Sequence, residues 1–254
     1  MDVKKNVTFE TKCYFNDWEF LLKQNRLAKM ISNCNYNFSS RRLFLNNFED
    51  YSEVKSYANQ LIKDNIIDEY YVVSDYAKET MDFFNLDKEG FKGGYYYSIA
   101  ELVSIYLCKT EFLLHFSSDA IMQNNCKTDW IESAIEVISS KDDVAVANPT
   151  WDFKFREAKS ESYAEDEDWF YSYGFSDQCY LIKTEDFRKD VFNEINSLSA
   201  RYPKYGGELF EKRVDSYIRN HQLKRISSKH CSYIHKNFPK NKLLKALKLK
   251  FGSY

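Results

Sequence analysis

The sequence predicts an α/β protein in which a mostly parallel β-sheet is covered by helices on both faces. Short apolar stretches rich in β-branched and aromatic residues alternate with segments of helical periodicity through residue 147, which is the pattern of repeated βαβ units. The chain has 254 residues with only 7 Gly and 3 Pro, and it contains no linker-like stretch and no internal repeat. A chain of this length buries a sizeable core, so we expect one large domain.

The first part of the chain supplies the clearest strand and helix signals. Residues 17–31 and 51–65 carry apolar side chains at near-helical spacing, which predicts two helices. The expected strands are residues 7–15, 42–48 and 70–73, and Ser74 and Asp75 close the last of them.

A helix start is marked by Ser98 and Glu101, which have the spacing of a capping box. From Ile99 onward, apolar residues recur at i, i+3, i+4, i+7 and i+8, which predicts an amphipathic helix. This helix leads into an apolar strand at 111–119.

The pattern loosens in the second half. The expected elements are a helix at 130–139, a strand at 144–147, a turn at 148–149, a strand at 174–182, helices at 184–198 and 208–220, and a last strand at 225–235. Residues 154–168 are strongly charged, which predicts a surface loop and the most mobile segment of the chain.

Composition excludes several classes of protein. The formal net charge is -2 with 29% charged residues, so no bulk field favours a nucleic-acid partner. The six cysteines are scattered without metal-ligand spacing, which predicts reduced, unpaired thiols in a cytoplasmic protein. The N-terminal residues lack an apolar secretory core, and no segment nears the roughly 20 apolar residues of a membrane-spanning helix.

The strand at 111–119 ends in Ser117, Ser118 and Asp119. Open α/β sheets bind ligands at the carboxyl ends of their strands, so these oxygen-bearing side chains predict a site where a divalent cation holds a phosphate. The structural alternative is that Asp119 only caps a helix or forms a turn. His115 lies inside the apolar strand, where we expect a hydrogen-bonded core histidine and not a ligand.

The α/β first half, the acidic strand end and the later half together resemble the GT-A glycosyltransferases. In that family a DxD motif after an apolar strand holds Mn2+ or Mg2+ against the diphosphate of a nucleotide sugar. The matching residues here are Ser117, Ser118 and Asp119, so a serine replaces the first aspartate and only Asp119 brings a charge to the metal. The resemblance implies a GT-A-like fold with a Rossmann-like nucleotide-binding half, an acceptor half and a nucleotide-sugar donor, for which UDP is favoured.

Three later segments also resemble the family. Residues 174–187 resemble the strand and helix start that contact acceptor and donor sugar, and residues 206–221 resemble the helix that carries the acidic base. Residues 224–235 resemble the closing strand whose histidine completes the metal shell, which implies His235 as the second metal ligand. His235 as a lone surface histidine is the alternative, and His230 is the fallback.

Asp177, Glu208 and Glu211 are the candidates for the base that deprotonates an acceptor hydroxyl. Glu211 borders the apolar face of the helix expected at 208–220, whereas Glu208 points nearly away from it. Because partial burial raises the pKa of a carboxylate, Glu211 is preferred on this helix, with a solvated ion pair as its alternative role. Asp177 lies in a polar break before an apolar strand, which suits binding of sugar hydroxyls. A retaining enzyme needs no such base, and the sequence leaves the stereochemistry open.

Nucleotide contacts are expected at the carboxyl ends of the first strands. The candidates are Thr11 or Lys12, Asn46, Asn47 and Asp75, together with Ser117 and Ser118. Each of the positions on the first strands is equally suited to turn chemistry. The sequence contains neither GxGxxG nor GxxxxGK[ST], which argues against dinucleotide-binding and P-loop proteins. No glycine precedes Gly90, which argues against the Gly-rich loop of nucleotidyltransferases.

We expect a single GT-A-like domain over 1–254, with a nucleotide-sugar half at 1–120, an acceptor half at 121–236 and a tail at 237–254. Five lysines of the tail alternate with leucines and a phenylalanine, which predicts a basic amphipathic helix. Such a helix can lie on an anionic membrane. Packing of its leucines against the domain is an equally good alternative.

The predicted function is transfer of a hexose from a nucleotide diphosphate sugar to a hydroxyl of a lipopolysaccharide, capsule or other bacterial surface glycan, with Mn2+ or Mg2+ as cofactor. The expected partners are a UDP-sugar and a glycan or lipid-linked glycan, without nucleic acid. The expected location is the cytoplasm, with peripheral contact to the inner face of the membrane through the tail. The alternatives are a metal-independent transferase and a non-catalytic carbohydrate- or partner-binding module that kept the fold.

Overall fold

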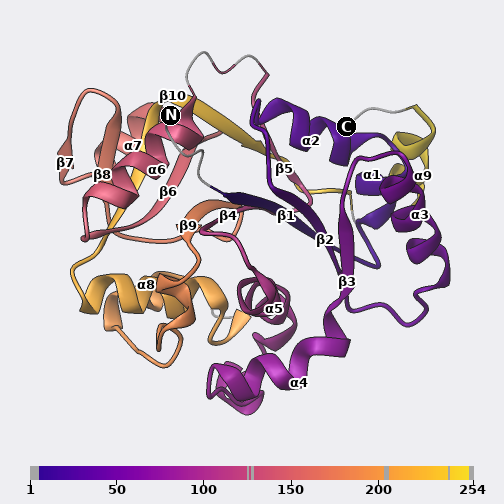
Figure 1. Cartoon of the computed structure of the whole chain (residues 1–254), viewed down its shortest axis with the longest axis horizontal. Helices are drawn as coiled ribbons and strands as arrows, with labels where there is room; N and C mark the ends of the chain where they lie inside the picture. Colours follow the sequence, from indigo (N-terminus) through magenta and orange to yellow (C-terminus); the bar gives the residue numbers. More distant parts are fainter. Residues whose placement is uncertain (1–5, 125, 127–128, 203–205, 240, 252–254) are drawn as a thin grey trace.

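One large twisted sheet with helices on both faces forms the molecule (Figure 1). The computed structural model describes residues 6–124, 126, 129–202, 206–239 and 241–251. The strand order is β3-β2-β1-β4-β9-β6-β10-β8-β7, and β5 pairs with β10 outside this path. The predicted α/β class is confirmed.

Seven of the ten described strands run in one direction. Six of them are β1 (Val7–Tyr14), β2 (Ser40–Asn46), β3 (Glu69–Val72), β4 (Phe112–Phe116), β6 (Val144–Trp151) and β10 (Lys224–His235). The seventh is the two-residue edge strand β7 (Ala164–Glu165), and the strands of opposite direction are β5 (Ala120–Met122), β8 (Trp169–Ser172) and β9 (Cys179–Lys183). The carboxyl ends of the six strands therefore share one edge of the sheet.

Two hydrophobic cores lie on opposite faces of this sheet. The first core packs the sheet against α1 (Trp18–Leu22), α2 (Arg26–Asn33), α3 (Ser52–Lys63) and α6 (Trp130–Ser140). The second core packs it against α4 (Val73–Phe83), α5 (Ile99–Leu107) and α8 (Phe210–Asn220). Because side chains alternate along a strand, β1 places Phe9 and Cys13 in the first core and turns Glu10 and Lys12 to the other face. There Lys12 pairs with Glu101 of α5, and Glu10 contacts His115 of β4.

Several expected boundaries in the first half change. The helix expected at 17–31 is split into α1 and α2, because Asn25 adopts a left-handed conformation with φ of 58°. The strand expected at 70–73 runs directly into α4, so Asp75 lies in the first turn of a helix and not at a strand tip. Short 3-10 turns, Glu89–Phe91 and Tyr95–Tyr97, connect α4 to α5.

The capping box expected at Ser98 and Glu101 does not form. The Ser98 hydroxyl donates to the Gly94 carbonyl at 2.9 Å and accepts from the Phe210 amide at 2.9 Å. Ser98 therefore joins the start of α5 to the start of α8, and Glu101 is free for a different partner.

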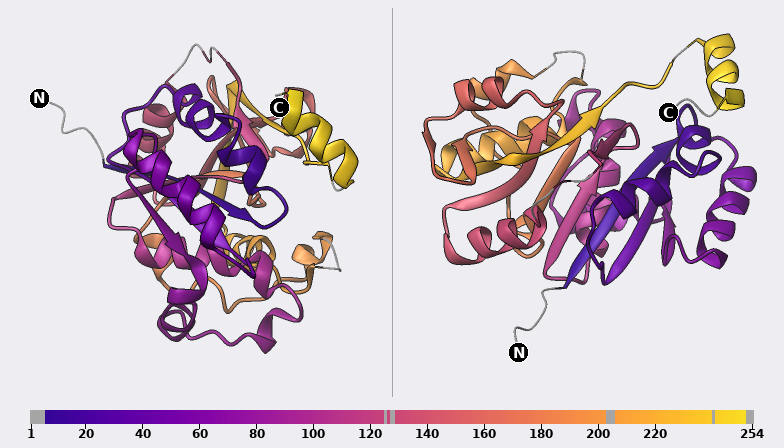
Figure 2. Two further views of the ribbon diagram at one scale, coloured as in Figure 1. Left: turned by 90° about the vertical axis from the view of Figure 1, so that its right-hand side faces the viewer. Right: turned by 90° about the horizontal axis from the view of Figure 1, so that it is seen from above.

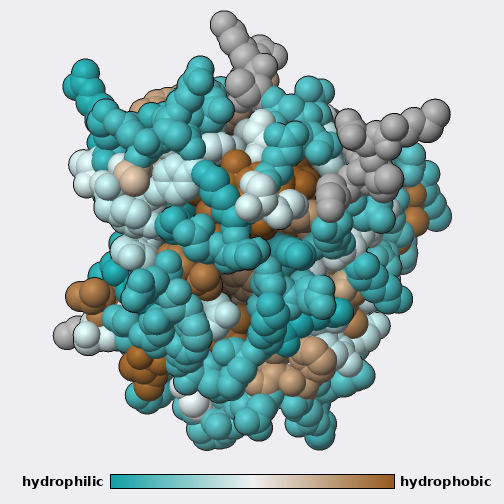
Figure 3. All heavy atoms as spheres, turned by 60° about the vertical axis from the view of Figure 1, so that its left-hand side comes forward, coloured by the Kyte–Doolittle hydropathy of each residue, from teal (hydrophilic) through white to brown (hydrophobic). Residues whose placement is uncertain are grey.

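In the second half, the structure revises four segments. β6 continues through Asn148 and Pro149, where a turn was expected. The expected surface loop at 154–168 contains α7 (Phe155–Glu161) and β7. The expected helix at 184–198 is replaced by irregular backbone with 3-10 turns at Asp186–Arg188 and Ser197–Arg201. Figure 3 shows that the surface on the side of α7 and α8 is mainly hydrophilic, with apolar residues in small separate groups.

A disulfide joins Cys126 to Cys231 across 105 residues. The expectation that all thiols are unpaired is therefore wrong for these two residues. Cys13, Cys34, Cys108 and Cys179 are free and buried. The scattered spacing in the sequence hid the pair, because only the folded sheet brings β10 beside the segment that follows β5.

The tail forms helix α9 (Lys242–Phe251), which lies beside the α1 region (Figure 2). Lys245 Nζ contacts the Glu19 carboxylate at 2.7 Å and the Asn16 carbonyl at 3.0 Å. Leu244 and Leu247 remain 45% and 46% exposed. No helix among the described residues is long and apolar enough to cross a membrane.

Candidate active site

Residues from β4, β5 and β10 meet at the shared strand edge. Ser117, Ser118 and Asp119 link the end of β4 to β5, and β5 pairs antiparallel with the end of β10. This pairing places Ala120 opposite His235. It therefore brings the acidic end of one strand beside the histidine at the end of another.

Asp119 and His235, the two predicted metal ligands, are in direct contact. His235 Nε2 lies 3.2 Å from Asp119 Oδ2, and each side chain is 20% exposed. The Ser117 hydroxyl donates to Asp119 Oδ1 at 2.9 Å. The side chain of Ser117 thus orients the carboxylate.

The contact changes the pKa of both side chains. Burial raises the pKa of Asp119, but the hydrogen bond and charge of His235 outweigh it and leave that pKa below its usual range. The hydrogen bond to Asp119 raises the pKa of His235 above 6.5, against the opposing effect of burial. The pair is an ion pair when protonated, and a divalent ion that binds it must displace the imidazolium proton.

The donor set fits a divalent metal. His235 Nε2 and Asp119 Oδ2, which lie 3.2 Å apart, would be the donor atoms that the protein offers to such an ion. Carboxylate oxygen suits Mn2+ and Mg2+, and imidazole is a common ligand of transition metals. Within the described part of the chain no group of three or more His, Cys, Asp or Glu could hold an ion.

Ser118 faces away from this pair. Its hydroxyl hydrogen-bonds the buried carboxylate of Asp17, and the Arg26 side chain donates to its carbonyl at 3.1 Å. Burial raises the pKa of Asp17 to about 7, despite the hydrogen bonds that Asp17 accepts from Ser118 and the Tyr14 amide. Asp17 was not expected at the site, and its only sequence signal is an acidic residue shortly after the first strand.

Glu211 and Asp177 form the second acidic group. The Asp177 amide donates to Glu211 Oε1 at 2.8 Å. Burial and the nearby Asp177 charge raise the pKa of Glu211 well above its usual value. Asp177 also contributes to the raised pKa of His235, and the adjacent Gln178 carbonyl accepts from the Ser117 amide at 2.9 Å. The structure thus places this acidic group beside the Asp119–His235 pair.

Glu208 has a different environment. It accepts from Lys212 at 2.9 Å, and although burial opposes it, contact with Lys212 leaves the pKa of Glu208 below its usual value. A carboxylate of this kind stays ionised and is a weak base. Of the three predicted candidates, Glu211 has the environment of a proton acceptor.

The residues predicted to contact the nucleotide differ in burial and in their hydrogen-bond partners. Thr11 is fully buried, with its hydroxyl unpartnered among the described residues. Lys12 pairs with the buried carboxylate of Glu101. Asn46 is buried and donates to the Tyr96 carbonyl at 3.1 Å. Asp75 is exposed on α4, where Ser74 donates to it at 3.5 Å.

Asn47 lines a pocket of about 480 Å³ beyond the ends of β1 and β2. Its other lining residues are aromatic, acidic or aliphatic, namely Phe15, Trp18, Phe48, Glu49, Asp50, Glu53 and Val54. A pocket of this volume is large enough for a small ligand.

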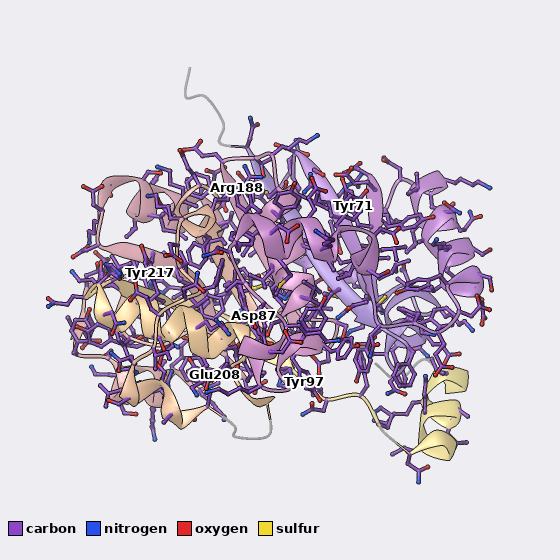
Figure 4. The ribbon with its side chains drawn as sticks, turned by 90° about the horizontal axis from the view of Figure 1, so that it is seen from below. Tyr71, Asp87, Tyr97, Arg188, Glu208 and Tyr217 are labelled. Atoms are coloured by element: carbon purple, nitrogen blue, oxygen red, sulfur yellow. A yellow bond between two sulfur atoms is a disulfide. The ribbon has the colours of Figure 1, made fainter. Side chains whose placement is uncertain are left out.

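Exposed aromatic side chains border the strand edge. Tyr14 and Tyr97 are 42% and 56% exposed. Partial burial is the largest cause that raises the pKa of Tyr14, followed by the charges of Asp17 and Asp119 and a smaller contribution from Tyr97. Tyr97 and Glu208 lie on the same side of the molecule (Figure 4). The Glu208 amide donates to the Phe91 carbonyl at 2.8 Å, which joins the start of α8 to the connection between α4 and α5.

No protein-family model matches the sequence, and no curated protein matches it. Among solved structures, a mycobacterial protein is similar over 97% of this chain and 70% of its own, with a TM-score of 0.51 and 12% identity. The structure of GalNAc-T7 with UDP, GalNAc and Mn2+ is similar over 94% of this chain, with a TM-score of 0.54 and 10% identity, and this chain spans only 45% of that protein. These similarities show the fold, which is the GT-A-like α/β fold that the sequence predicts.

Proposed function

We propose that the protein is a metal-dependent glycosyltransferase that moves a hexose from a UDP-sugar to a glycan hydroxyl. The observation that carries the proposal is the contact between Asp119 and His235 at the strand edge, 3.2 Å apart. The two come from segments more than 100 residues apart in the sequence. GalNAc-T7, which shares the fold, is known with UDP, GalNAc and Mn2+.

Asp119 and His235 would hold Mn2+ or Mg2+, with Ser117 orienting the carboxylate through its hydrogen bond. Such an ion would neutralise the diphosphate leaving group as the glycosidic bond breaks. Asp119 supplies the only carboxylate charge of the serine-containing motif, so its removal abolishes the site.

Glu211 is the proposed base. Its raised pKa makes it a stronger proton acceptor than an ordinary carboxylate, and Asp177 positions it through a backbone hydrogen bond of 2.8 Å. In an inverting reaction, Glu211 takes the acceptor hydroxyl proton while Asp177 binds sugar hydroxyls. In a retaining reaction, both carboxylates bind and orient sugar.

The nucleotide is proposed to lie over the ends of β1 and β2, where the pocket lined by Phe15, Trp18 and Asn47 opens. Aromatic rings favour stacking of a planar base, and the Asn47 amide offers both a donor and an acceptor. Thr11, Asn46 and Ser118 then act from behind this surface, because their side chains are buried. Asp75 is exposed on α4, and nothing in its contacts supports a nucleotide role.

The proposed acceptor is a lipopolysaccharide, capsule or other surface glycan on the cytoplasmic side of a bacterial membrane. Helix α9 supports this assignment, because exposed Leu244 and Leu247 lie among lysines, a combination that binds anionic lipid surfaces.

A non-catalytic sugar-binding module is the second candidate. It is favoured by the serine at position 117 and by the lack of a three-ligand metal cluster among the described residues. The buried Glu211, with its raised pKa, favours the enzyme, because a pure binding site gains nothing from a proton acceptor.

Turnover assays on a panel of UDP-hexoses test the proposal. UDP release should require Mn2+ or Mg2+ and should be lost in Asp119→Ala, while the variant keeps the fold by circular dichroism. Release that continues in EDTA would support a metal-independent transferase. Sugar binding without any UDP release would support the module.

A further inference from the structure

The turn that follows β6 has an unusual backbone. Asp152 and Phe153 are consecutive and both left-handed, with φ of 48° and 58°. Left-handed backbone is disfavoured for a bulky residue such as Phe, and each such residue costs on the order of 1–3 kcal/mol. A glycine or asparagine would relieve this cost, and the chain uses asparagine at most of its other left-handed positions.

Hydrogen bonds to β10 hold this turn in place. The Asp152 amide donates to the Tyr233 carbonyl at 2.7 Å, and the Phe153 amide donates to the Ser232 hydroxyl at 2.8 Å. The His235 amide donates to Asp152 Oδ1 at 2.9 Å. The turn is thus fastened to the end of the strand that carries the proposed metal ligand.

This backbone presents the Phe153 ring to solvent. The side chain is 55% exposed, whereas most phenylalanines of the chain are buried. β6 and β10 are parallel and in register at Trp151 and Tyr233. The turn follows this pair directly, and Asp152, the residue before Phe153, accepts a hydrogen bond from the His235 amide. An exposed ring held by strained backbone beside a site indicates a functional constraint and not a packing role.

We propose that Phe153 is the platform on which the acceptor sugar packs, with the apolar C–H face of a pyranose ring against the phenyl ring. The inference rests on the proposed function for its acceptor, and it adds the substrate class: a pyranoside, whose hydroxyls Asp177 and Glu211 would bind. Sugar sites combine apolar and aromatic surface with a few polar groups that fix orientation.

Phe153→Gly separates binding from folding. Glycine accepts the left-handed conformation without strain, so this variant should melt at the same temperature as the wild type or higher. Phe153→Ala removes the ring but keeps the strain, and Phe153→Tyr keeps the ring. Phe83→Ala is the matched control, because Phe83 is 49% exposed but packs against Phe84 and Tyr106 on the α4 side of the molecule.

Binding of methyl pyranosides of glucose, galactose, mannose and N-acetylglucosamine is measured by saturation-transfer NMR in the presence of UDP and the diamagnetic ion Mg2+. We expect one or more of them to bind the wild type, Phe153→Tyr and Phe83→Ala alike. Phe153→Gly and Phe153→Ala should bind it roughly tenfold more weakly, with Mn2+-dependent UDP binding unchanged in all variants. Equal pyranoside binding by the wild type and Phe153→Gly would overturn the platform, and so would a wild type that binds Mn2+ and UDP but none of the pyranosides. Failure of UDP binding in the wild type would instead contradict the proposed function, and pyranoside binding that still depends on Phe153 would then keep the platform as part of a binding module.

Discussion

Asp17 shows how much the chemistry of one residue depends on distant parts of the chain. Its carboxylate bonds Ser118, 101 residues away, and burial raises its pKa to about 7. A folded-state pKa above the unfolded value means that the protonated form is the favoured one in the native state. The resulting stability is complete below about pH 4 and is lost as the pH rises through about 7.

We expect Asp17→Asn to remove this pH dependence, because an amide imitates the protonated carboxyl. Relative to the variant, the wild type should lose on the order of 4 kcal/mol of unfolding free energy between about pH 4 and pH 8. The charged groups that act on Asp17 are Lys12 and Asp119, and both are common to the two proteins. Urea titrations across this range check the effect, and parallel stability curves would contradict it.

Glu211 and Glu208 lie three residues apart on or beside α8 and differ in environment. Because burial raises the pKa of Glu211 and Lys212 helps keep that of Glu208 low, we expect Glu211→Gln to lower kcat by about 100-fold or more in an inverting enzyme. Glu208→Gln is the matched control and should change kcat little. Steady-state kinetics with saturating UDP-sugar measure both, and equal losses would exclude Glu211 as the base.

Among single residues, the sequence predicts those candidates whose position follows from a local strand or helix pattern. Asp119 and His235 could be predicted as candidates because Asp119 closely follows an apolar strand and His235 ends one, and Glu211 because helical periodicity places it beside an apolar face. Asp17 could not, because its partner Ser118 and its burial arise only when β1 and β4 pair. The metal and base roles of these residues stay predictions.

Among the elements, the disulfide has the clearest consequence for the site. Cys126 follows β5 and Cys231 lies in β10, the two strands whose pairing aligns Ala120 with His235. The bridge therefore closes the part of the sheet that holds Asp119 and His235 together.

Reduction of this disulfide should destabilise the fold by about 2–4 kcal/mol, because the bridge closes a long loop in the unfolded chain. Cys126→Ser should show the same loss, and dithiothreitol should not affect this variant further. Guanidinium titrations of both proteins, with and without dithiothreitol, measure the difference. A wild type whose midpoint ignores dithiothreitol would show that the bridge contributes no stability.

Elements with strong periodicity were predictable, and those fixed by tertiary contacts were not. The helices at 130–140 and 210–220 and the strand at 224–235 appear where the pattern places them. Residues 184–198 have an apolar pattern that suggests a helix, yet Val191 and Phe192 pack into the second core from irregular backbone. Local sequence does not encode that preference, because the neighbouring strands and α8 supply the packing partners.

The whole molecule joins two halves through one sheet. The expected first half, residues 1–120, contains β1 to β4 and the pocket at Asn47, and the expected second half, residues 121–236, contains β6, β10, Asp177, Glu211 and His235. The fold class was predictable, because alternating strands and helices admit few architectures. The insertion of antiparallel β9 between β4 and β6 was not, because a strand's neighbours depend on the connections and not on its own residues.

Titration calorimetry of UDP tests the central claim most directly. The control variant is His230→Gln, because the His230 imidazole contacts only the exposed Asp168 among the described carboxylates. The wild type and this control should bind UDP in Mn2+ and bind it at least about tenfold more weakly in EDTA. Asp119→Ala and His235→Ala should bind equally weakly under both conditions. UDP affinity that is the same with Mn2+ and EDTA in the wild type, or unchanged in both variants, would contradict a metal held at the end of β4.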